Sequence, residues 1–580
     1  MRLAIWILVL SQAALAQQRE RWFEVRIADK AAGRAHELVA PIDGGFETSS
    51  DSETLIARLD AKLDLKVRTS VRESPSGRLL AVHVETDFSA QTTATDVSFS
   101  GLVATVREQA GSAAPHERTV ALQAEPFGPE ALRLQSAAKL HAVGDELSLP
   151  VWAAELGMAA TVRRKVLARE GEALRVEEKY DGTPVTRTIW LDGQGELLRS
   201  ESAAPFGVIA MVRKPSAPLL TAAELPKESF ENTLLRSNVR LPQPRSLSRM
   251  VARFSLRDGA SIDLASDTQR LLDGALEVRR ALPPEAPPDL TAGAEFLEAG
   301  VLIDSGDPEV RRIAALAPGE GWERALALTH WTAKNMKFDL GIVFAPASEL
   351  ARDLRGTCVG YATLLAALLR AAHIPSRVVF GYVYTGGMFG GHAWVEAKFG
   401  SRWIPLDAAL PSGGTADAAR IAIAHDSLRD GPGRILSVLQ QVYGNATVAV
   451  VEYGGAQAAK APYLVADRRY MNPGLGLSVE APAGMSFAKV DAIWPDRTLV
   501  SLEGRGGKIS VEEDELDPSL PRVQALQAAL RKPCEARLIA GRPGCATADS
   551  LAFADGSTVY VVKASKPRLL QAAVRGIELR

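Results

Sequence analysis

The chain has 580 residues, a formal net charge of −2 and a hydrophobic content of 47%. Because its lysines and arginines are scattered along the sequence, this charge gives no electrostatic case for binding nucleic acid or an anionic membrane. The length predicts three or four domains, each large enough to bury a hydrophobic core of its own.

Residues 1–16 have the pattern of a cleavable secretory signal. Arg2 precedes an apolar run at residues 3–10, and Ala-Leu-Ala at 14–16 supplies a cleavage site. A retained membrane anchor is the alternative, although the run is short for a bilayer span. No other stretch is long and apolar enough to span, and no cysteine follows the cleavage site as a lipoprotein anchor requires. We therefore expect a soluble bacterial protein in the periplasm or secreted.

Residues 17–240 are predicted to form a β-rich N-terminal domain. Residues 63–72 alternate strictly between apolar and polar, which buries one face of a strand and exposes the other. Similar alternation recurs in three segments, at residues 79–84, 161–167 and 185–190. An Asp-Gly-Gln-Gly turn at 192–195 indicates a hairpin, and we expect long hairpins packed as a sheet or sandwich. The isolated histidines of this region are assigned surface or structural roles: His83, His116 and His141.

Residues 241–300 are predicted to be a linker with a β segment. Proline-rich stretches at 241–244 and 282–288 bracket a β-leaning stretch at 250–264, and they are typical of semi-rigid linkers. A catalytic domain is predicted at 301–455. Its first half is helical from Asp307-Pro308 to residue 335, and residues 435–451 are predicted as a closing strand or a helix plus strand.

A proline-glycine break at 472–474 is predicted to introduce a small α+β C-terminal domain, residues 474–580. Its expected elements are strands and helices at residues 477–479, 499–502, 521–530 and 559–579. The acidic run at 512–515 lacks the alternating ligand spacing of a calcium loop, so we expect it on a solvated face.

The chain has three cysteines, and an exported protein tends to pair them. Cys534 and Cys545 flank a short segment with turn residues near its end, so a local disulfide is the simplest of the three possible pairings. Two reduced, half-buried thiols are the alternative. Cys358 is then the unpaired thiol, and an unpaired thiol in an oxidising compartment indicates a functional role.

Cys358 is predicted to open a buried helix. Apolar residues follow it at helical spacing with a high content of leucine and alanine, and Pro375 ends the helix. Thr357 is a suitable N-cap. At this position the helix dipole and the free N–H groups favour a thiolate, and they also stabilise a developing oxyanion.

His392 and Asp407 lie on the two arms of a predicted hairpin. The arms, 392–399 and 402–407, flank Gly400-Ser401, a plausible two-residue turn. With that turn Asp407 faces Trp394, and His392 is diagonally adjacent on the same face, within side-chain reach. A register slip of one residue would place the two on opposite faces. The remaining histidines have no comparable setting: His330, His373 and His425.

A thiol, an imidazole and a carboxylate in this setting are the groups of a cysteine nucleophile with its base and orienter. The stretch at about 322–409 resembles the core of the transglutaminase-like superfamily, a cysteine at a helix start followed by a His strand and an Asp strand. The matching segments lie at residues 355–358, 368–379, 392–396 and 403–407. Two positions depart from the family, namely Val359-Gly360, where relatives often carry polar residues, and His373, where glycine is more usual.

The resemblance implies that Cys358 is the nucleophile, His392 the base and Asp407 the orienter. The resemblance is to the exported bacterial branch of this superfamily, in which such a core follows a large β-rich region. The predicted fold is therefore a multidomain α+β protein with a β-rich N-terminal region, a central transglutaminase-like core of the papain-like α+β kind, and a small α+β C-terminal domain. The short interval from Cys358 to His392 differs from the papain class, in which the histidine lies far downstream.

The expected activity is hydrolysis of a peptide or amide bond through a thioester, because an exported protein meets water in excess. The alternatives are a cross-linking transglutaminase with an amine acceptor, and a non-catalytic binding or scaffold protein of the cell envelope. We expect a peptide or protein substrate and no cofactor, and the sequence has no paired Cys/His spacing typical of a metal site. The glycine-rich residues 385–391 are a candidate lid or substrate rim.

Overall fold

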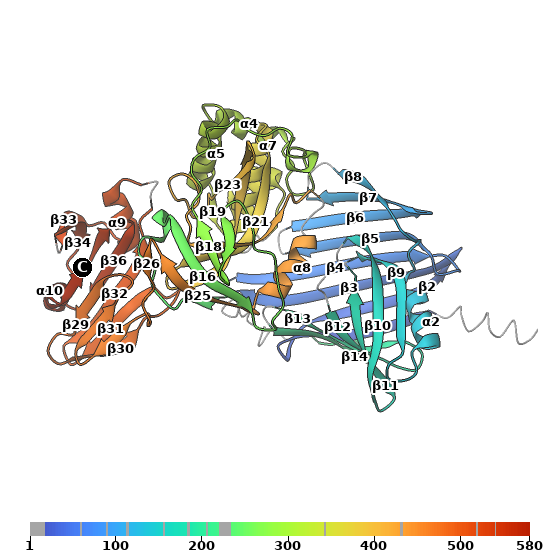
Figure 1. The fold of residues 1–580 in the computed structure, drawn as a ribbon. Coiled ribbons are helices and arrows are strands. Elements are labelled where there is room, and N and C mark those ends of the chain that lie inside the picture. Colours follow the sequence, from blue (N-terminus) through green and yellow to red (C-terminus); the bar gives the residue numbers. More distant parts are fainter. Residues whose placement is uncertain are drawn as a thin grey trace, which may run out of the picture.

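The computed structural model shows a β-rich protein with several sheets and a helical cluster in its middle (Figure 1). The residues that the structure describes are 18–58, 61–88, 91–111, 115–154, 157–181, 186–204, 207–219, 234–340, 344–429, 433–517, 520–539 and 541–579. The predicted secretory signal, residues 1–16, lies outside them. Within these ranges, no helix is both long enough and apolar enough to cross a bilayer.

The N-terminal part of the chain is one antiparallel sheet of fourteen strands. Its strands are β1 (Arg19–Ile27), β2 (Lys30–Ile42), β3 (Gly45–Arg58), β4 (Ala61–Glu73), β5 (Leu79–Phe88), β6 (Gln91–Ser100), β7 (Val103–Ala110), β8 (His116–Ala121), β9 (Glu146–Ala153), β10 (Met158–Glu170), β11 (Ala173–Tyr180), β12 (Thr186–Leu191), β13 (Leu197–Ala204) and β14 (Gly207–Lys214). The chain meanders from β1 out to β8, passes through helix α2 (Pro129–Lys139), and returns from β9 to β14, which pairs with β1.

This sheet folds onto itself because its alternating strands leave one apolar face to be covered. Trp152 of β9 packs in one cluster with Leu79, Val97 and other apolar residues of β5 to β7, and its ring meets Phe99 edge-on. The two arms of the meander therefore bury their apolar faces against each other. The prediction of long antiparallel hairpins for this region is confirmed.

The middle of the chain places four helices against a small sheet. The helices are α4 (Pro308–Leu316), α5 (Gly321–Asn335), α6 (Ala347–Asp353) and α7 (Cys358–Ala371), preceded by the 3-10 turn η4 (Ala294–Phe296). The sheet consists of β15 (Leu235–Arg236), β21 (Ser376–Thr385), β22 (Met388–Phe399), β23 (Arg402–Leu406) and β24 (Arg420–Asp426). Between the helices, β19 (Lys337–Phe338) and β20 (Arg355–Gly356) form a short parallel pair.

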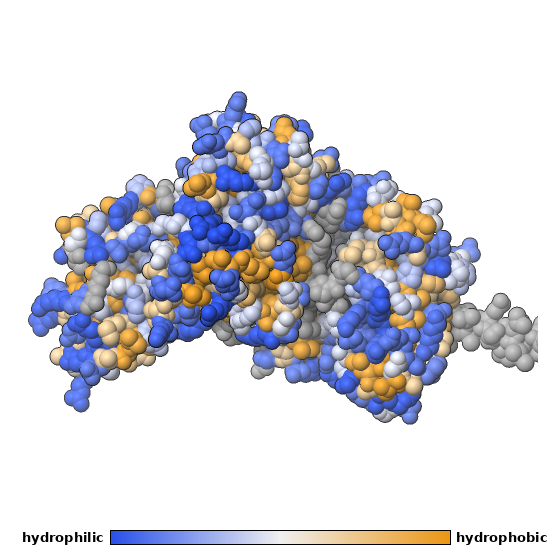
Figure 2. All heavy atoms as spheres, viewed as in Figure 1, coloured by the Kyte–Doolittle hydropathy of each residue, from blue (hydrophilic) through white to orange (hydrophobic). Residues whose placement is uncertain are grey.

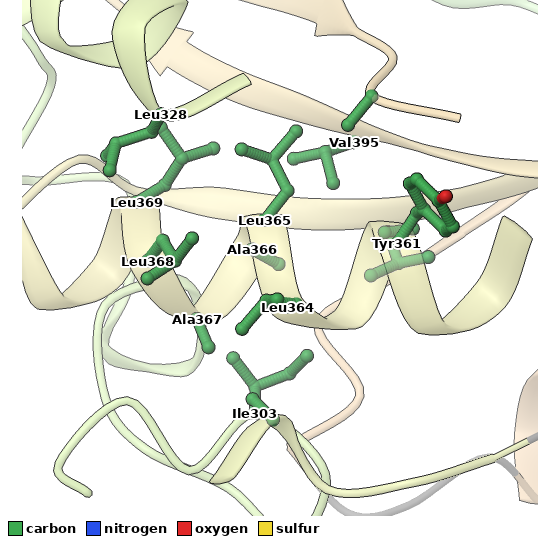
Figure 3. Packing of buried hydrophobic residues seen from close by; sticks show 14 of the residues in the cluster. Ile303, Leu328, Tyr361, Leu364, Leu365, Ala366, Ala367, Leu368, Leu369 and Val395 are labelled. Atoms are coloured by element: carbon green, nitrogen blue, oxygen red, sulfur yellow. The ribbon is translucent and has the colours of Figure 1, made fainter. Parts of the chain in front are cut away.

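Helix α7 is the centre of the largest hydrophobic cluster. Its side chains are apolar on all sides, which is typical of a helix buried on all sides. Figure 3 shows Leu365 and Leu369 directed toward Leu328 of α5 and Val395 of β22, while Leu364 faces Ile303. The helix is thus held from both sides, and its first residue, Cys358, has a fixed place relative to β22.

A second sheet joins segments that are far apart in the sequence. It contains β16 (Arg249–Leu256), β17 (Gln269–Leu272), β18 (Ala275–Arg279), β25 (Ala446–Tyr453) and β26 (Ala456–Gln457). Helix α8 (Gly433–Val442) leads into β25, as the predicted helix plus strand requires. On the face in Figure 2, apolar residues gather near the middle of the molecule, around β16 and β18, among hydrophilic surroundings.

The C-terminal part has two further sheets and a disulfide. One contains β27 (Leu464–Ala466), β28 (Arg469–Asn472), β29 (Leu477–Glu480) and β37 (Ile577–Leu579); the other contains β30 (Met485–Val490), β31 (Thr498–Gly504), β32 (Gly507–Glu515), β33 (Glu535–Ile539), β34 (Arg542–Ala546), β35 (Ser550–Asp555) and β36 (Thr558–Ala564). Helices α9 (Arg522–Leu530) and α10 (Pro567–Arg575) complete it. The predicted disulfide between Cys534 and Cys545 is present.

Two expectations for loops and surface are wrong. The proline-rich segment at 241–244 is not a spacer, because Leu241 is fully buried and the chain turns there through η3 (Pro244–Ser246). The acidic run is not a solvated face, because Glu513 is buried and bonded to Arg240. Both errors have one cause: Arg240 and Arg245, which flank the proline-rich segment, pair with Glu513 and Glu515, and a local pattern does not reveal such a distant partner. The proline-glycine break at 472–474 leads into a turn between two paired strands, β28 and β29.

Candidate functional site

The thiol of Cys358 stands at the first turn of α7, as predicted. Thr357 occupies the N-cap position, but its side chain makes no capping hydrogen bond. The first-turn N–H groups of α7 are therefore not used by this side chain, and they carry the positive end of the helix dipole. Cys358 as a residue is partly exposed, at the end of an otherwise buried helix.

The hairpin that carries the other two groups has the predicted register. Phe399 pairs with Arg402, and the pairing runs back to Val395 opposite Leu406. Asp407 directly follows β23 and lies diagonally across from His392 of β22. The Nε2 atom of His392 is 2.8 Å from Oδ2 of Asp407. Both side chains are buried, since His392 is 6% exposed and Asp407 3%.

The imidazole of His392 lies close enough to the thiol of Cys358 for its charge and its hydrogen-bonding capacity to act on that thiol. Because Nε2 faces Asp407, Nδ1 is the ring nitrogen left for the sulfur. Burial raises the pKa of the Cys358 thiol, but the hydrogen bond and the charge of His392 outweigh burial, so this pKa lies below its ordinary value. The backbone N–H of Ala393 acts in the same direction. The structure thus brings the three predicted site residues together.

Charge stabilises the protonated form of the imidazole. Burial lowers the pKa of His392, but the charge of Asp407 and its hydrogen bond raise it, to about 9. Burial also opposes ionisation of Asp407, but the charges of His392 and Arg420 keep the pKa of this carboxyl well below its usual range. The arrangement favours a thiolate beside an imidazolium, which is the reactive state of a cysteine nucleophile.

Asp407 has a full set of donors. Its Oδ1 atom accepts from the backbone N–H groups of Ala409 and Leu410, each at 2.9 Å. Its Oδ2 atom accepts from His392 and, at 2.7 Å, from Arg420. A carboxylate held by four donors cannot turn away from the imidazole without breaking several hydrogen bonds, so Asp407 is fixed in its position facing His392.

Two neighbours of the site were missed in the sequence. Arg420, the first residue of β24, contacts Asp407 because β24 pairs with β21 in the same sheet. Tyr443 follows α8, donates to the carbonyl of Gly381 at 3.1 Å, and packs against Gly391 so closely that a Cβ there would lie 3.1 Å from its hydroxyl. An arginine in a strand and a tyrosine after a helix carry no local signal of this role.

The glycine-rich residues 385–391 do not form an open lid. Met388 to Gly391 are part of β22 and pair with β21, and only Gly386 and Gly387 make the turn, with positive φ angles. A substrate rim remains compatible with the structure. Thr385 and Gly386 line a cavity of about 350 Å³ between the sheet that contains β21 and β22 and the C-terminal part.

This cavity lies beside the proposed site. Tyr361, one turn after Cys358, forms part of its wall, as do Ala408 and Ala409, which directly follow Asp407. The opposite wall comes from the C-terminal part and includes Trp494 and Glu515. Neighbours of Cys358 and Asp407 thus line this cavity, although Cys358, His392 and Asp407 are not among its lining residues.

The histidines that were left out of the site lie elsewhere. His330 is exposed on α5. His373 follows α7 with a φ of 57°, the left-handed conformation that commonly ends a helix and favours glycine. The Nε2 atom of His425, in β24, lies 3.6 Å from Oε2 of Glu396, and burial lowers the pKa of His425 to about 3. Among the described residues, no cluster of three or more His, Cys, Asp or Glu side chains could hold a metal ion.

Residues 310–408 match the family model described as the transglutaminase-like superfamily, which confirms the predicted resemblance. Three solved structures are similar to parts of the chain. A candidate cysteine protease from Cytophaga hutchinsonii is 17% identical, with a TM-score of 0.25, over 39% of this chain and 88% of that one. A β-barrel-like protein of a domain of unknown function from Brucella abortus is 12% identical, with a TM-score of 0.26, over 34% and 94%.

The third structure is a candidate protease from Parabacteroides distasonis, 11% identical with a TM-score of 0.17, over 90% of this chain and 95% of that one. Similarities at these TM-scores establish neither a shared overall fold nor a shared activity. No curated protein matches the chain.

Proposed function

Because residues 310–408 are a domain of the transglutaminase-like superfamily, we propose that this protein is an exported cysteine-dependent acyl-transfer enzyme that hydrolyses peptide or amide bonds. Cys358 is the nucleophile, His392 the acid and base, and Asp407 the group that orients His392. The observation that carries the proposal is the hydrogen bond between the buried imidazole of His392 and the buried carboxylate of Asp407, with the same imidazole lowering the pKa of the thiol of the partly exposed Cys358.

The reaction proceeds in two halves. The thiolate of Cys358 attacks the carbonyl carbon, and the C=O electron pair moves onto oxygen to give a tetrahedral intermediate. This intermediate collapses to a thioester as the C–N bond breaks, and His392 gives its proton to the departing amine. Water then attacks the thioester while His392 takes one of its protons, and the second collapse releases the carboxylic acid and the thiolate.

The start of α7 supports the first half of this reaction. The intermediate carries a negative oxygen close to the attacked carbon, and backbone N–H groups at a helix N-terminus stabilise such an oxyanion. The N–H of Cys358 is the donor nearest to the nucleophile along the chain. Thr357 does not occupy the first-turn donors with its side chain, which leaves them for this role.

Substrate class and compartment follow from the surroundings of the site. The cavity beside Tyr361 and Ala408 opens between two sheets, which suits an extended peptide or protein segment. The disulfide between Cys534 and Cys545 supports export, because disulfides persist in oxidising compartments. We therefore propose a peptide or protein substrate in the periplasm or outside a bacterial cell.

The first test is the alkylation rate of Cys358 by iodoacetamide as a function of pH, with the labelled peptide identified by mass. Since Cys534 and Cys545 are paired, Cys358 is the thiol that this reagent reports. We expect fast labelling with an apparent pKa below the ordinary value of about 8.5, and much slower labelling in His392→Ala. A thiol that stays inert until the protein is denatured contradicts the proposal.

The second test distinguishes the proposed hydrolase from the two alternatives, a cross-linking transglutaminase and a non-catalytic binding protein. Peptide amides are incubated with the wild-type protein in the presence and absence of a labelled alkylamine, with Cys358→Ala as the matched control. Release of the free acid in both conditions supports hydrolysis. Incorporation of the amine in preference to hydrolysis identifies a cross-linking transglutaminase. No product over a broad peptide set, despite a reactive Cys358, favours a binding or scaffold protein.

A further inference from the structure

A series of buried ion pairs of alternating sign leads from the proposed site to the C-terminal part. Arg420 lies 2.7 Å from Oδ2 of Asp407 and 2.5 Å from Oδ2 of Asp417. Arg245 then lies 2.8 Å from the same oxygen of Asp417 and 2.9 Å from Oε2 of Glu515. Five charged side chains therefore form one continuous path, from the residue that faces His392 to the last residue of β32.

This path is mostly inaccessible to water. Asp407, Asp417, Arg420 and Arg245 are all buried, and only Glu515 is partly exposed. Buried charges are costly unless each one is paired and hydrogen-bonded, so removing one member leaves its neighbour unpaired. The positions of these side chains are consequently interdependent.

The members come from segments that are distant in the sequence. Arg420 begins β24 in the sheet that contains β21 and β22, and Asp417 precedes it by three residues. Arg245 lies in the turn η3, in the segment that the sequence predicted as a linker. Glu515 ends β32 of the C-terminal sheet. The path therefore joins the proposed catalytic residues to a sheet that contributes no residue to the chemistry.

We propose that Arg420 is a positioning residue for the Asp407–His392 pair, and that Asp417, Arg245 and Glu515 couple this pair to the docked C-terminal sheet. This inference rests on the proposed function. Arg420 shares one oxygen of Asp407 with His392, so it holds the carboxylate ionised and sets its rotation toward Nε2. Asp417 in turn fixes the guanidinium, which also lies over the ring of Trp394 at 5.3 Å.

The charged groups around Arg420 define the expected effect of its removal. Asp407 and Asp417 face it directly, and the cation Arg280 lies near enough to interact with both Asp417 and Arg420. On the other side of Asp407 stand His392 and, beyond it, Cys358. Without Arg420, Asp407 loses one of its two cationic neighbours, and the orientation of His392 depends on a carboxylate that is less firmly held.

The test is the pH profile of Cys358 alkylation by iodoacetamide in the wild type and in three folded variants, Arg420→Gln, Arg420→Lys and Arg377→Gln. In Arg420→Gln we expect a rate about ten- to a hundredfold lower, the size of effect found for the outer partners of metal-bound histidines. The acidic limb of the profile should move to higher pH, because Asp407 then takes up a proton more readily. Arg420→Lys should recover part of the rate, since it restores the charge without the forked geometry.

Arg377→Gln is the matched control. It disrupts another ion pair of the same sheet, with the buried Glu396, but Arg377 makes no contact with Asp407. Its alkylation profile should match that of the wild type. If Arg377→Gln and Arg420→Gln change the profile equally, the effect is a general loosening of the sheet, and the positioning role of Arg420 is overturned.

Coupling to the C-terminal sheet is tested with Glu515→Gln, alone and combined with Arg420→Gln. The single change should lower the alkylation rate a few-fold, and the double variant should react no more slowly than Arg420→Gln alone, because both changes act through one path. Independent, multiplying effects overturn the coupling. If wild-type Cys358 itself is unreactive and insensitive to His392→Ala, the proposed function fails first, so the two failures are distinguishable.

Discussion

Replacing Asp407 with asparagine keeps the shape of the side chain, removes its charge and turns one oxygen into a donor. The carboxylate accepts from two backbone N–H groups through Oδ1 and from His392 and Arg420 through Oδ2. An asparagine has one oxygen to offer. Its NH₂ group must therefore face either the two backbone donors or the two side-chain donors, and one pair loses its acceptor.

The magnitude follows from the electrostatics of the site. The pKa of His392 is raised from 6.5 to about 9, with Asp407 as the main cause of the increase, which corresponds to about 3 kcal/mol in favour of the imidazolium. Losing most of this preference lowers the thiolate population of Cys358 near neutral pH on the order of a hundredfold. Turnover should fall further, toward the loss of about 10⁴-fold seen when asparagine replaces the triad aspartate of serine proteases.

The assay measures both quantities in the same protein. The alkylation rate of Cys358 reports the thiolate, and kcat for a peptide amide reports the full reaction. Asp426→Asn is the matched control, because Asp426 is a buried aspartate at the end of β24 whose Oδ1 accepts from the N–H of Leu428, away from the thiol. Circular dichroism establishes that each variant is folded.

We expect Asp426→Asn to retain the alkylation rate of the wild type, and Asp407→Asn to lose it. A folded Asp407→Asn protein with unchanged alkylation and turnover would refute the reasoning, because the contact between Nε2 of His392 and Oδ2 of Asp407 would then have no role in activating the thiol. Breaking a buried ion pair by removing one partner costs about 3–5 kcal/mol, so a lower unfolding midpoint accompanies the loss of activity.

Three further predictions concern other contacts. In Cys358→Ala, Asp407 still raises the pKa of His392 above 6.5, so the stabilising charge is present below pH 6.5 and is lost as pH rises through this raised pKa; the unfolding midpoint should fall over this range, and not in Cys358→Ala/His392→Gln. Cys534→Ser opens a disulfide that spans 11 residues, and should lower the unfolding free energy by about 3 kcal/mol in denaturant titrations, with no effect of reductant on the variant. Gly391→Ala places a Cβ 3.1 Å from the Tyr443 hydroxyl, so the Tyr443 ring beside His392 must give way by a few tenths of an ångström and turnover should drop; an unchanged rate would mean that the tyrosine moves freely.

Local patterns predicted much of the proposed site because the relevant contacts are close in sequence. The two-residue turn at 400–401 sets the pairing of Phe399 with Arg402, and this register by itself puts His392 and Asp407 on one face. The leucine- and alanine-rich stretch after Cys358 favours a helix wherever it is packed. Cys534 and Cys545 are separated by 11 positions, and strands β33 and β34 bring them together through one short turn.

Other features depend on contacts across long sequence distances. Arg420 contacts Asp407 although β24 and β23 lie on opposite sides of the β21–β22 pair in the sheet. Arg240, the last residue of the predicted β-rich N-terminal domain, is buried between Asp491 and Glu513 of the C-terminal part. The burial of Glu513 is equally invisible in an acidic run, since a carboxylate is buried only where a cation from elsewhere compensates its charge.

The amino-acid sequence by itself determined the strands, the buried helix that begins at Cys358, the hairpin register and the disulfide. Each of these follows from periodicity, turn chemistry or short separation, which act within a few residues. Only the tertiary structure decided that the thiol meets His392, that Arg420 supports Asp407, and that Glu515 connects to them through Arg245. These contacts join elements that are far apart in the sequence. They form because each buried charge or apolar surface needs a partner that is supplied by another part of the folded chain.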